Sequence, residues 1–511
     1  MFTPPESFNL ADHILDARLR EGRGARIAVR TATGSLTFAE IAAQAARFGN
    51  LLTSAGILPE QRVMIALPDG PDYVAALFGI LKMGAVVVMV NPDLKPDAIA
   101  QLFAYTRASA VWTDPDHADV FTAASRSSPR CRAVFVTGTP AFDTLLSSAA
   151  DALATFPTHR DDPAIWLFSG GTTGRPKAVV QTHRAFAYTT ACYGHGVLDY
   201  REDDITMSVP KLFFGYATGS NLLFPFSVGA SCVLFPERCT AEELFSQLER
   251  HRPTILVNVP SMVNQMVNHR TAAARDLRHL RLATSAGEAL PIELDRRWRD
   301  TFGVDLLDGL GTAEQWHVFI SNRPGAARPG TIGQVVPGFT VKVCGEDGAE
   351  LPDGETGWLW VTGGARAIGY WQLQEQTERA FRGEWYVSGD LVSRDSDGFF
   401  TYQGRADDLL KVRGKWLSPQ EVESCLLEHP QVREVAVIGA ADDAGLIAPV
   451  AFVVLVEPGL SGARQRALTE ELKTFARERL DAYKHPREIV FLDTLPRTHL
   501  GKVDRGALKR R

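Results

Sequence analysis

Short apolar runs recur through the first 340 residues, and glycine-containing turns and helical stretches separate them. They lie at Arg62–Leu67, Ala133–Thr137, Ala164–Phe168, Ile255–Val259 and Leu280–Thr284. Strands that alternate with helices in this way predict parallel sheets covered by helices on both faces, an α/β fold. The chain has 511 residues, which exceeds what one hydrophobic core usually organises, so we expect at least two domains.

One apolar stretch, Tyr73–Val90, is long enough to resemble a membrane span. Lys82 and Gly84 interrupt it where a helix would end and turn into a strand. The sequence therefore predicts a helix over Asp72–Met83, a turn at Gly84 and a buried strand over Ala85–Val90.

The pattern changes near residue 340. Thr340–Cys344, Trp358–Thr362 and Phe399–Tyr402 are expected to be short strands joined by turns, which is typical of a hairpin-rich or barrel-like section. A further block begins near Gly404. Its expected helices and strands are Pro419–Glu428, Arg464–Leu480, Glu434–Ile438 and Val450–Val456. We therefore expect a large domain of residues 1–404 and a small α+β domain of residues 405–511.

Composition and charge narrow the classes of function. The formal net charge is −6, from 54 Lys and Arg against 60 Asp and Glu, so neither nucleic acid nor an anionic membrane is expected as a partner. The six cysteines include no C-x-x-C pair, which gives little support to a zinc or redox site. Few cysteines and the lack of a signal-like N-terminus favour a cytoplasmic location.

The strongest motif is Ser169-Gly170-Gly171-Thr172-Thr173-Gly174-Arg175-Pro176-Lys177, directly after an apolar strand. Its glycines allow the backbone to approach an anion, and its N–H groups can form a phosphate nest. Pro176 stands where a Walker A loop needs glycine, and the spacing does not fit a dinucleotide-binding G-x-G-x-x-G. The motif predicts a phosphate-binding loop to which hydroxyls and the Lys177 ammonium contribute; a flexible turn is the weaker alternative.

A second motif is Asp308-Gly309-Leu310-Gly311-Thr312-Ala313-Glu314-Gln315-Trp316-His317. Its two glycines permit close backbone approach, and Thr312 offers a hydroxyl donor. Glu314 is a hard oxygen ligand suited to Mg²⁺ shared with ATP phosphates. Taken alone, the motif fits a strand-end turn with a solvated glutamate equally well.

Two weaker motifs follow. In Tyr386-Val387-Ser388-Gly389-Asp390, a carboxylate behind a glycine turn can accept hydrogen bonds from both hydroxyls of a ribose. Lys502 ends Pro496-Arg497-Thr498-His499-Leu500-Gly501-Lys502 near a basic C-terminus. Alone, the first fits an ordinary turn and the second a solvated surface charge.

Together and in this order, the four motifs make the chain resemble the adenylate-forming superfamily of acyl-CoA synthetases, carrier-protein adenylation domains and luciferases. Leu36–Phe38, Ser285–Pro291 and Gly404–Asp408 also match, and Lys211–Tyr216 and Trp316–Phe319 are most similar to benzoate–CoA ligases. The resemblance implies a large N-terminal domain of two sheet-and-helix subdomains and a β-barrel. It also implies a small mobile C-terminal lid with its hinge at Asp407.

The resemblance implies roles in binding ATP and in the first step. ATP and AMP would be bound by Ser169, Gly170, Thr172, Thr173, Gly174, Lys177, Gly287, Glu288, Asp308, Gly309, Asp390 and Arg405. Lys502, Glu314 and Thr312 would be catalytic: Lys502 would offset the repulsion between the acid and the α-phosphate, and Glu314 would hold Mg²⁺. No tightly bound organic cofactor is expected, and a homodimer is compatible with the sequence.

Different residues are implied for the acid and for coenzyme A. The acyl pocket would be formed by Phe214, Gly215, Tyr216, Gly311, His317 and Val318, whose aromatic and small side chains suit a flat ring. A structural histidine remains the alternative for His317. Rotation of the lid would withdraw Lys502 and bring Lys411 and Gly414 to coenzyme A. Gly215 stands where related benzoate enzymes often carry alanine, so an amino- or hydroxybenzoate is an expected substrate beside benzoate.

Some positions depart from the family pattern. Gly171, Ala178, Ala313 and Leu500 replace residues that are usually Ser, Gly, Thr or Ser, and Thr, respectively. None removes a charge that the chemistry needs. We therefore expect ATP-dependent ligation of an aromatic carboxylic acid to coenzyme A through an aryl-adenylate, with release of AMP and pyrophosphate. Transfer of the aryl group to a carrier protein, or an inactive nucleotide-binding relative, are the alternatives.

Overall fold

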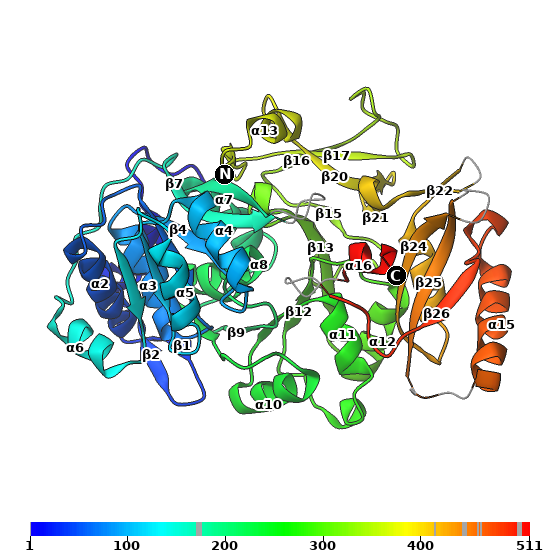
Figure 1. Cartoon of the computed structure of the whole chain (residues 1–511), viewed down its shortest axis with the longest axis horizontal. Coiled ribbons are helices and arrows are strands. Elements are labelled where there is room, and N and C mark those ends of the chain that lie inside the picture. Colours follow the sequence, from blue (N-terminus) through cyan, green and yellow to red (C-terminus); the bar gives the residue numbers. More distant parts are fainter. Residues whose placement is uncertain are drawn as a thin grey trace.

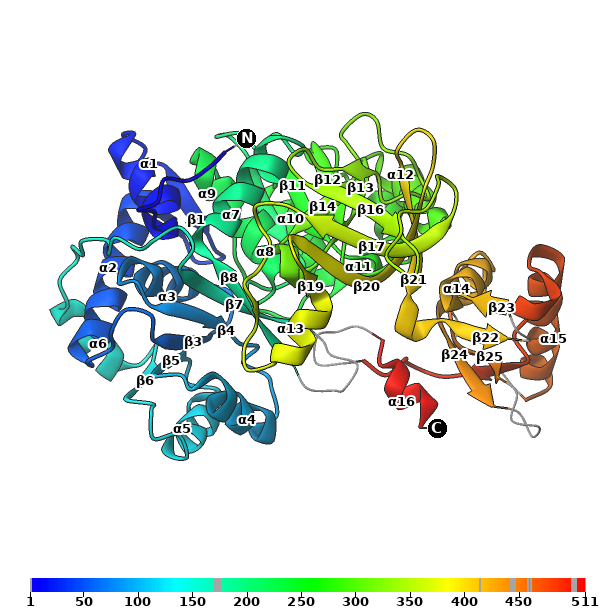
Figure 2. The same cartoon turned by 90° about the horizontal axis from the view of Figure 1, so that it is seen from above.

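The computed structural model describes residues 2–169, 176–412, 415–441, 447–456, 459, 462–497 and 503–510. It consists of a large body that contains three sheets and a small domain that begins after β21 (Phe400–Arg405) (Figures 1 and 2). This is the mixed α/β fold, with a large N-terminal and a smaller C-terminal domain, that the sequence predicts.

The first sheet has seven strands, and its central pairings are parallel. In spatial order they are β18 (Gly369–Tyr370), β8 (Lys177–Thr182), β7 (Pro163–Ser169), β4 (Val86–Met89), β3 (Arg62–Ala66), β5 (Ala110–Thr113) and β6 (Ala133–Val136). Alternate side chains of β3 enter two separate apolar clusters, one with α2 (Phe38–Ser54) and α3 (Pro71–Lys82), the other with α4 (Pro96–Thr106) and α5 (Ala118–Arg126). Helices therefore cover both faces, as expected for short apolar strands.

The apolar stretch Tyr73–Val90 folds as predicted, as α3 followed by a turn and β4. Gly84 has a φ of +77°, a conformation that favours glycine. Lys82, buried at the end of α3, is neutralised by Asp16, whose two carboxylate oxygens both lie 2.7 Å from Nζ. Among the described residues, no helix combines the length and apolarity that crossing a membrane requires.

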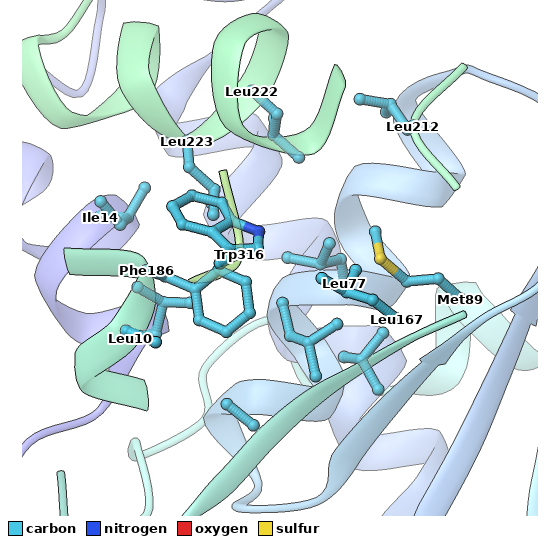
Figure 3. Close-up of a cluster of buried hydrophobic side chains, with 14 of the residues drawn as sticks. Leu10, Ile14, Leu77, Met89, Leu167, Phe186, Leu212, Leu222, Leu223 and Trp316 are labelled. Atoms are coloured by element: carbon cyan, nitrogen blue, oxygen red, sulfur yellow. The ribbon is translucent and has the colours of Figure 1, made fainter. Parts of the chain in front are cut away.

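The second sheet has nine strands and is parallel from β13 to β1. In spatial order they are β15 (Gln334–Val335), β14 (Val318–Ser321), β13 (Leu306–Gly311), β12 (Leu282–Ser285), β11 (Ile255–Asn258), β9 (Ile205–Ser208), β10 (Ser231–Val233), β1 (Ile27–Arg30) and β2 (Ser35–Thr37). One face packs on α10 (Ala241–His251), α11 (Pro260–Val267) and α12 (Ile292–Phe302), while the other shares its core with the first sheet. The layer between the two sheets is the largest apolar core (Figure 3).

The section expected to be barrel-like is a five-stranded antiparallel sheet. It is formed by β16 (Thr340–Cys344), β17 (Thr356–Thr362), β19 (Phe381–Arg382), β20 (Trp385–Arg394) and β21. In β17, exposed or half-buried positions alternate with buried ones, which is the pattern of a sheet with one face on the core.

The small domain follows a short turn, Ala406–Asp408. It contains the hairpin β22 (Leu410–Val412) and β23 (Lys415–Leu417), the sheet of β24 (Val432–Ala441), β25 (Ile447–Leu455) and β26 (Glu488–Phe491), and the helices α14 (Pro419–Leu427), α15 (Gly462–Arg479) and α16 (Arg505–Lys509). Asn264 Nδ2 of α11 donates to the carbonyl of Arg433, 2.7 Å away, and so joins the large body to β24. In both views α16 lies on the side of the large body, whereas the β22–β23 hairpin points away from it (Figures 1 and 2).

The N-terminal segment is fixed against the first sheet. The Leu10 N–H donates to Nδ1 of His183, 3.0 Å away, and Asn9 Nδ2 donates to the carbonyl of Leu81, 2.8 Å away. His183 begins α7 (His183–Thr189), directly after β8, and burial lowers the pKa of its imidazole to about 3. The unprotonated Nδ1 of the neutral imidazole therefore accepts the hydrogen bond from the Leu10 N–H.

Candidate active site

The ends of the predicted phosphate-binding loop are held as a hairpin. Ser169 ends β7, Lys177 begins β8, and the two residues are antiparallel partners. Gly170, Thr172, Thr173 and Gly174 lie outside the described residues. The Lys177 ammonium lies 5.2 Å from the ring centroid of Tyr370, and the Tyr370 hydroxyl donates to Glu314 Oε1 over 2.8 Å. Tyr370 therefore connects the first and second motifs in space.

Glu314 is fixed by contacts to both its backbone and its side chain. Its backbone carbonyl accepts the Ala367 N–H at 2.8 Å, and Gln181 Nε2 donates to the neighbouring Ala313 carbonyl at 2.7 Å. The side chain is buried. Burial, followed by the charge of Glu314, raises the pKa of Tyr370, so that this phenol remains a hydrogen-bond donor. The result is a buried, oriented carboxylate that could ligate a hard cation carried by ATP.

The third motif lies next to this network. Asp390 of β20 pairs with Arg405 of β21, and its Oδ1 accepts from the Tyr402 hydroxyl at 3.1 Å and lies 3.5 Å from Arg405 Nη1. The Ser388 hydroxyl donates to the other carboxylate oxygen. Burial, and then the nearby Glu314, Tyr370 and Asp390, raise the pKa of Tyr386. The structure therefore brings Lys177, Glu314 and Asp390 to one region of the large body.

Among the residues predicted for the acyl pocket, His317 and Val318 are buried, whereas Phe214, Gly215, Tyr216 and Gly311 are half-buried. His317 Nε2 lies 3.1 Å from the Tyr216 carbonyl and 3.2 Å from Ser220 Oγ. The rings of Phe224 and Tyr193 lie 4.8 and 5.5 Å from the imidazole, centroid to centroid. Burial lowers the pKa of His317 to about 3, and its Nδ1 has no hydrogen-bond partner among the described residues. His317 is therefore a neutral imidazole in an aromatic environment.

Glycines allow the backbones to approach closely around this histidine. A Cβ on Gly311 would lie 2.5 Å from the His317 carbonyl oxygen, and one on Gly219 would lie 2.4 Å from His317 Cδ2. Gly311 of β13 pairs with Val318 of β14, which is buried. A Cβ on Gly215 would lie 3.3 Å from Leu167 Cδ1, so the space beside Gly215 is bounded by a flexible side chain.

Several predicted ATP-binding residues have distinct surroundings. Thr312 Oγ1 and Asp308 Oδ1 are buried and have no hydrogen-bond partner among the described residues, so both could take part in binding a polar ligand. Burial raises the pKa of Asp308 well above its usual range. Glu288 instead accepts hydrogen bonds from the Ser261 N–H at 3.0 Å and from its hydroxyl at 3.3 Å, at the start of α11. Its carboxylate thus caps a helix in this structure.

The residues predicted for the coenzyme A step lie in the small domain. Lys411 is exposed, pairs with Trp416 across the β22–β23 hairpin, and places its ammonium 5.6 Å from that ring centroid. Asp407 is exposed in the turn before the hairpin. Gly414 and Lys502 lie outside the described residues. The β22–β23 hairpin, to which Lys411 belongs, lies in the small domain and points away from the large body (Figure 2).

Some residues at the site were not found from the sequence. Tyr370 lies far along the chain from Lys177 and carries no motif of its own. Tyr193, Ser220 and Thr284 complete the surroundings of Tyr216 and His317, and the Tyr216 hydroxyl lies 2.6 Å from Thr284 Oγ1. Gly219 carried a weak signal, because it lies one helical turn after Gly215 in a predicted pocket segment.

Comparison with known proteins identifies the family of the chain. The family model of AMP-binding enzymes matches residues 16–371, and that of the AMP-binding enzyme C-terminal domain matches residues 421–502. Benzoate–CoA ligase of Thauera aromatica is 38% identical over 99% of this chain and 96% of its own length. The 4-hydroxybenzoate–CoA/benzoate–CoA ligase of Rhodopseudomonas palustris is 37% identical over 99% of this chain and 94% of its own length.

A solved anthranilate CoA ligase in complex with anthranoyl-AMP superposes with a TM-score of 0.94. Its sequence identity is 36%, and the match covers 99% of this chain and 98% of that one. The first family model alone matches more than half of the chain. The chain belongs to the AMP-binding enzyme family.

Proposed function

We propose that this enzyme is an AMP-forming aryl–CoA ligase that acts on benzoate or an amino- or hydroxybenzoate. The observation that carries the proposal is the link from Lys177 through Tyr370 to Glu314, next to the aromatic cluster around His317. The first set of groups suits phosphates and a metal ion, and the second suits a flat aromatic ring. The names of the full-length relatives support the same substrate class.

The chemistry explains why both regions are needed. A carboxylate does not react with a thiol directly, because the leaving group would be oxide. Attack of the acid on the α-phosphorus of ATP releases pyrophosphate and gives a mixed anhydride, from which AMP leaves when the thiol attacks. In the first step two anions must approach, and unit charges about 4 Å apart repel by roughly 4 kcal/mol at an effective dielectric near 20.

We propose that charged groups of this chain bind ATP and offset that repulsion. Lys177 would bind the β- and γ-phosphates, and Asp390 with Arg405 would orient the ribose. Glu314 would hold Mg²⁺ carried by ATP, whose charge would offset that of the phosphates. Lys502, from the small domain, would stabilise the charge that develops between the acid and the α-phosphate.

The uncharged environment of His317 supports binding of the ring rather than of the phosphates. A neutral imidazole adds no charge to the pocket, and its unpartnered Nδ1 can accept one hydrogen bond from a ring substituent or a water. The acid would enter with its ring among Tyr216, His317 and Val318, and its carboxylate towards the Glu314 side.

For the second step we propose that residues 405–511 rotate about Asp407. The rotation would withdraw Lys502 and bring Lys411 and the glycine at position 414 to the acyl carbonyl. The short turn before the hairpin and the junction at Asn264 are compatible with such a movement.

The test is a panel of benzoates assayed with ATP, Mg²⁺ and coenzyme A. We expect AMP, pyrophosphate and aryl-CoA to form in equal amounts without any partner protein. Omission of coenzyme A should leave aryl-adenylate and pyrophosphate. Adenylate formation without thioester in the presence of coenzyme A would favour a carrier-protein acceptor. A preference for fatty acids, or no pyrophosphate with any acid, would refute the proposal.

A further inference from the structure

Asp69 is a buried carboxylate that lies outside all the motifs. It stands between β3 and α3 with 5% of its surface exposed. An aspartate this close to a helix start often caps the first turn. Here the N-cap is Gly70, which has no side chain, whereas Asp69 Oδ1 accepts the N–H of Leu212 at 2.8 Å, 143 residues away. The carboxylate therefore connects the first sheet to the segment that follows β9.

Lys211, the residue before Leu212, is held by the second sheet. Lys211 Nζ donates to the Phe235 carbonyl at 2.6 Å and lies 3.8 Å from the centroid of that ring. Phe235 follows β10 in the second sheet. Burial raises the pKa of Asp69 to about 6, and the Lys211 charge acts in the opposite direction. Consecutive residues 211 and 212 are thus fixed by both large sheets.

The anchored pair begins the segment that carries the predicted acyl-pocket residues. The Phe214 N–H donates to the Lys211 carbonyl at 2.9 Å, and Thr218 Oγ1 donates to the Leu212 carbonyl at 2.6 Å. These two bonds define the turn that leads into α8 (Gly215–Thr218). The Leu212 side chain enters the same apolar cluster as Met89 and Leu167 (Figure 3).

We propose that Asp69 is a positioning residue that determines selectivity among aromatic acids. It holds the Leu212 N–H, and thereby fixes the Phe214–Tyr216 backbone against the ring of the acid. Displacement of a positioned backbone by a fraction of an ångström is enough to change how a rigid ring fits. The inference rests on the proposed function only in that Phe214–Tyr216 borders the acid.

The test compares Asp69→Ala with Asp69→Asn, because asparagine keeps an oxygen that can accept the Leu212 N–H. Loss of a buried charged acceptor should raise KM for the best acid about tenfold in Asp69→Ala, while KM for ATP stays within about twofold. The ratio of kcat/KM between benzoate and its ring-substituted forms should move towards one. Asp69→Asn should restore KM for the acid to within about threefold of the parent.

The matched control is Asp204→Asn, which changes another buried aspartate near the other end of β9. Asp204 accepts from Arg281 and Thr254, away from residues 211–216. The Asp204→Asn substitution should lower Tm, but it should not change KM for the acid relative to KM for ATP. Equal changes in KM for acid and ATP in Asp69→Ala, or equal loss in the Ala and Asn variants, would overturn the proposal.

The assay uses whichever acid the parent enzyme prefers, with pyrophosphate release as the readout. If the parent prefers an acid other than a benzoate, the proposed function fails, yet the Asp69 comparison can still be made with that acid. If benzoates are accepted but KM for the acid and KM for ATP change equally in Asp69→Ala, only the proposed role of Asp69 is refuted.

Discussion

The cluster around His317 and the hairpin that carries Lys411 differ in how tightly their surroundings fix them. His317 is 3% exposed and contacts side chains or backbone from several elements of the large body, including Tyr193, Tyr216 and Ser220. Lys411 is exposed, and its ammonium lies over the ring of Trp416, which is itself 58% exposed. The proposed acid site therefore lies in the core of the large body, whereas Lys411, proposed for the second step, lies on the surface of the small domain. The comparison indicates that the two half-reactions can be separated by mutation.

The largest effect is expected from Lys502→Ala. Loss of a cation at the developing charge should slow adenylation about a thousandfold. Thioester formation from supplied aryl-adenylate should be largely retained, because the proposed rotation removes this lysine before the second step. Pyrophosphate release and aryl-CoA formation measure the two steps separately.

Lys509→Ala, which removes an exposed lysine at the end of α16, serves as the control and should leave both steps unchanged. An equal loss of both half-reactions in Lys502→Ala would show that the two regions do not act in turn.

Glu314→Gln tests the charged part of the large body. The substitution keeps the shape of the side chain but removes its charge, so adenylation should fall roughly a hundredfold, with a higher Mg²⁺ requirement. Titration of Mg²⁺ at fixed ATP measures this. Glu375→Gln, on the exposed helix α13 (Gln374–Ala380), should have no such effect. An unchanged Mg²⁺ dependence would remove Glu314 from the metal site.

Gly311→Ala tests whether the acid site is preformed. A Cβ here would lie 2.5 Å from the His317 carbonyl oxygen and 2.7 Å from the Val318 nitrogen, so the backbone must move. KM for the acid should rise about tenfold, because the displaced strand borders the ring. Gly34→Ala adds the same methyl group where nothing lies within 4 Å and should be neutral. Wild-type KM in Gly311→Ala would contradict a closely packed pocket.

The smallest effect is expected from Asn264→Ala, at the junction of the two domains. Loss of its bond to the Arg433 carbonyl should change the ratio of the adenylation rate to the thioester rate about twofold, since a single neutral hydrogen bond contributes little. Asn50→Ala, which removes bonds to the carbonyls of Ala150 and Ala152 within the large body, is the control. The ratio should remain unchanged in the control and shift in the test variant.

Local signals in the sequence predicted much of the fold. The helix, turn and strand at 71–89 follow from apolar residues, Lys82 and a glycine with positive φ. The strand before the predicted phosphate-binding loop, and α14, α15, β24 and β25 of the small domain, also lie close to where they were expected. These features depend on periodicity and turn chemistry over a few residues.

Long-range contacts at the site could not be predicted in the same way. The sequence around Asp69 indicates an ordinary Pro-Asp-Gly turn. Only the folded chain shows that its carboxylate accepts a hydrogen bond from the Leu212 N–H. In the sequence, nothing distinguishes Tyr370 from other strand tyrosines. In the folded chain, β18 pairs with β8 and brings Tyr370 to Lys177 and Glu314. The role of Glu288 as a helix cap depends on a contact to Ser261 that no spacing rule specifies.

The bond between the Leu10 N–H and His183 has a practical consequence for engineering this chain. Shortening the protein through Leu10 would deprive a buried imidazole of its donor and would also remove the Asn9 bond to the end of α3. The damage would occur where β8 passes into α7, on the strand that starts with Lys177. An affinity tag is therefore safer as an addition before the first residues than as a replacement for them.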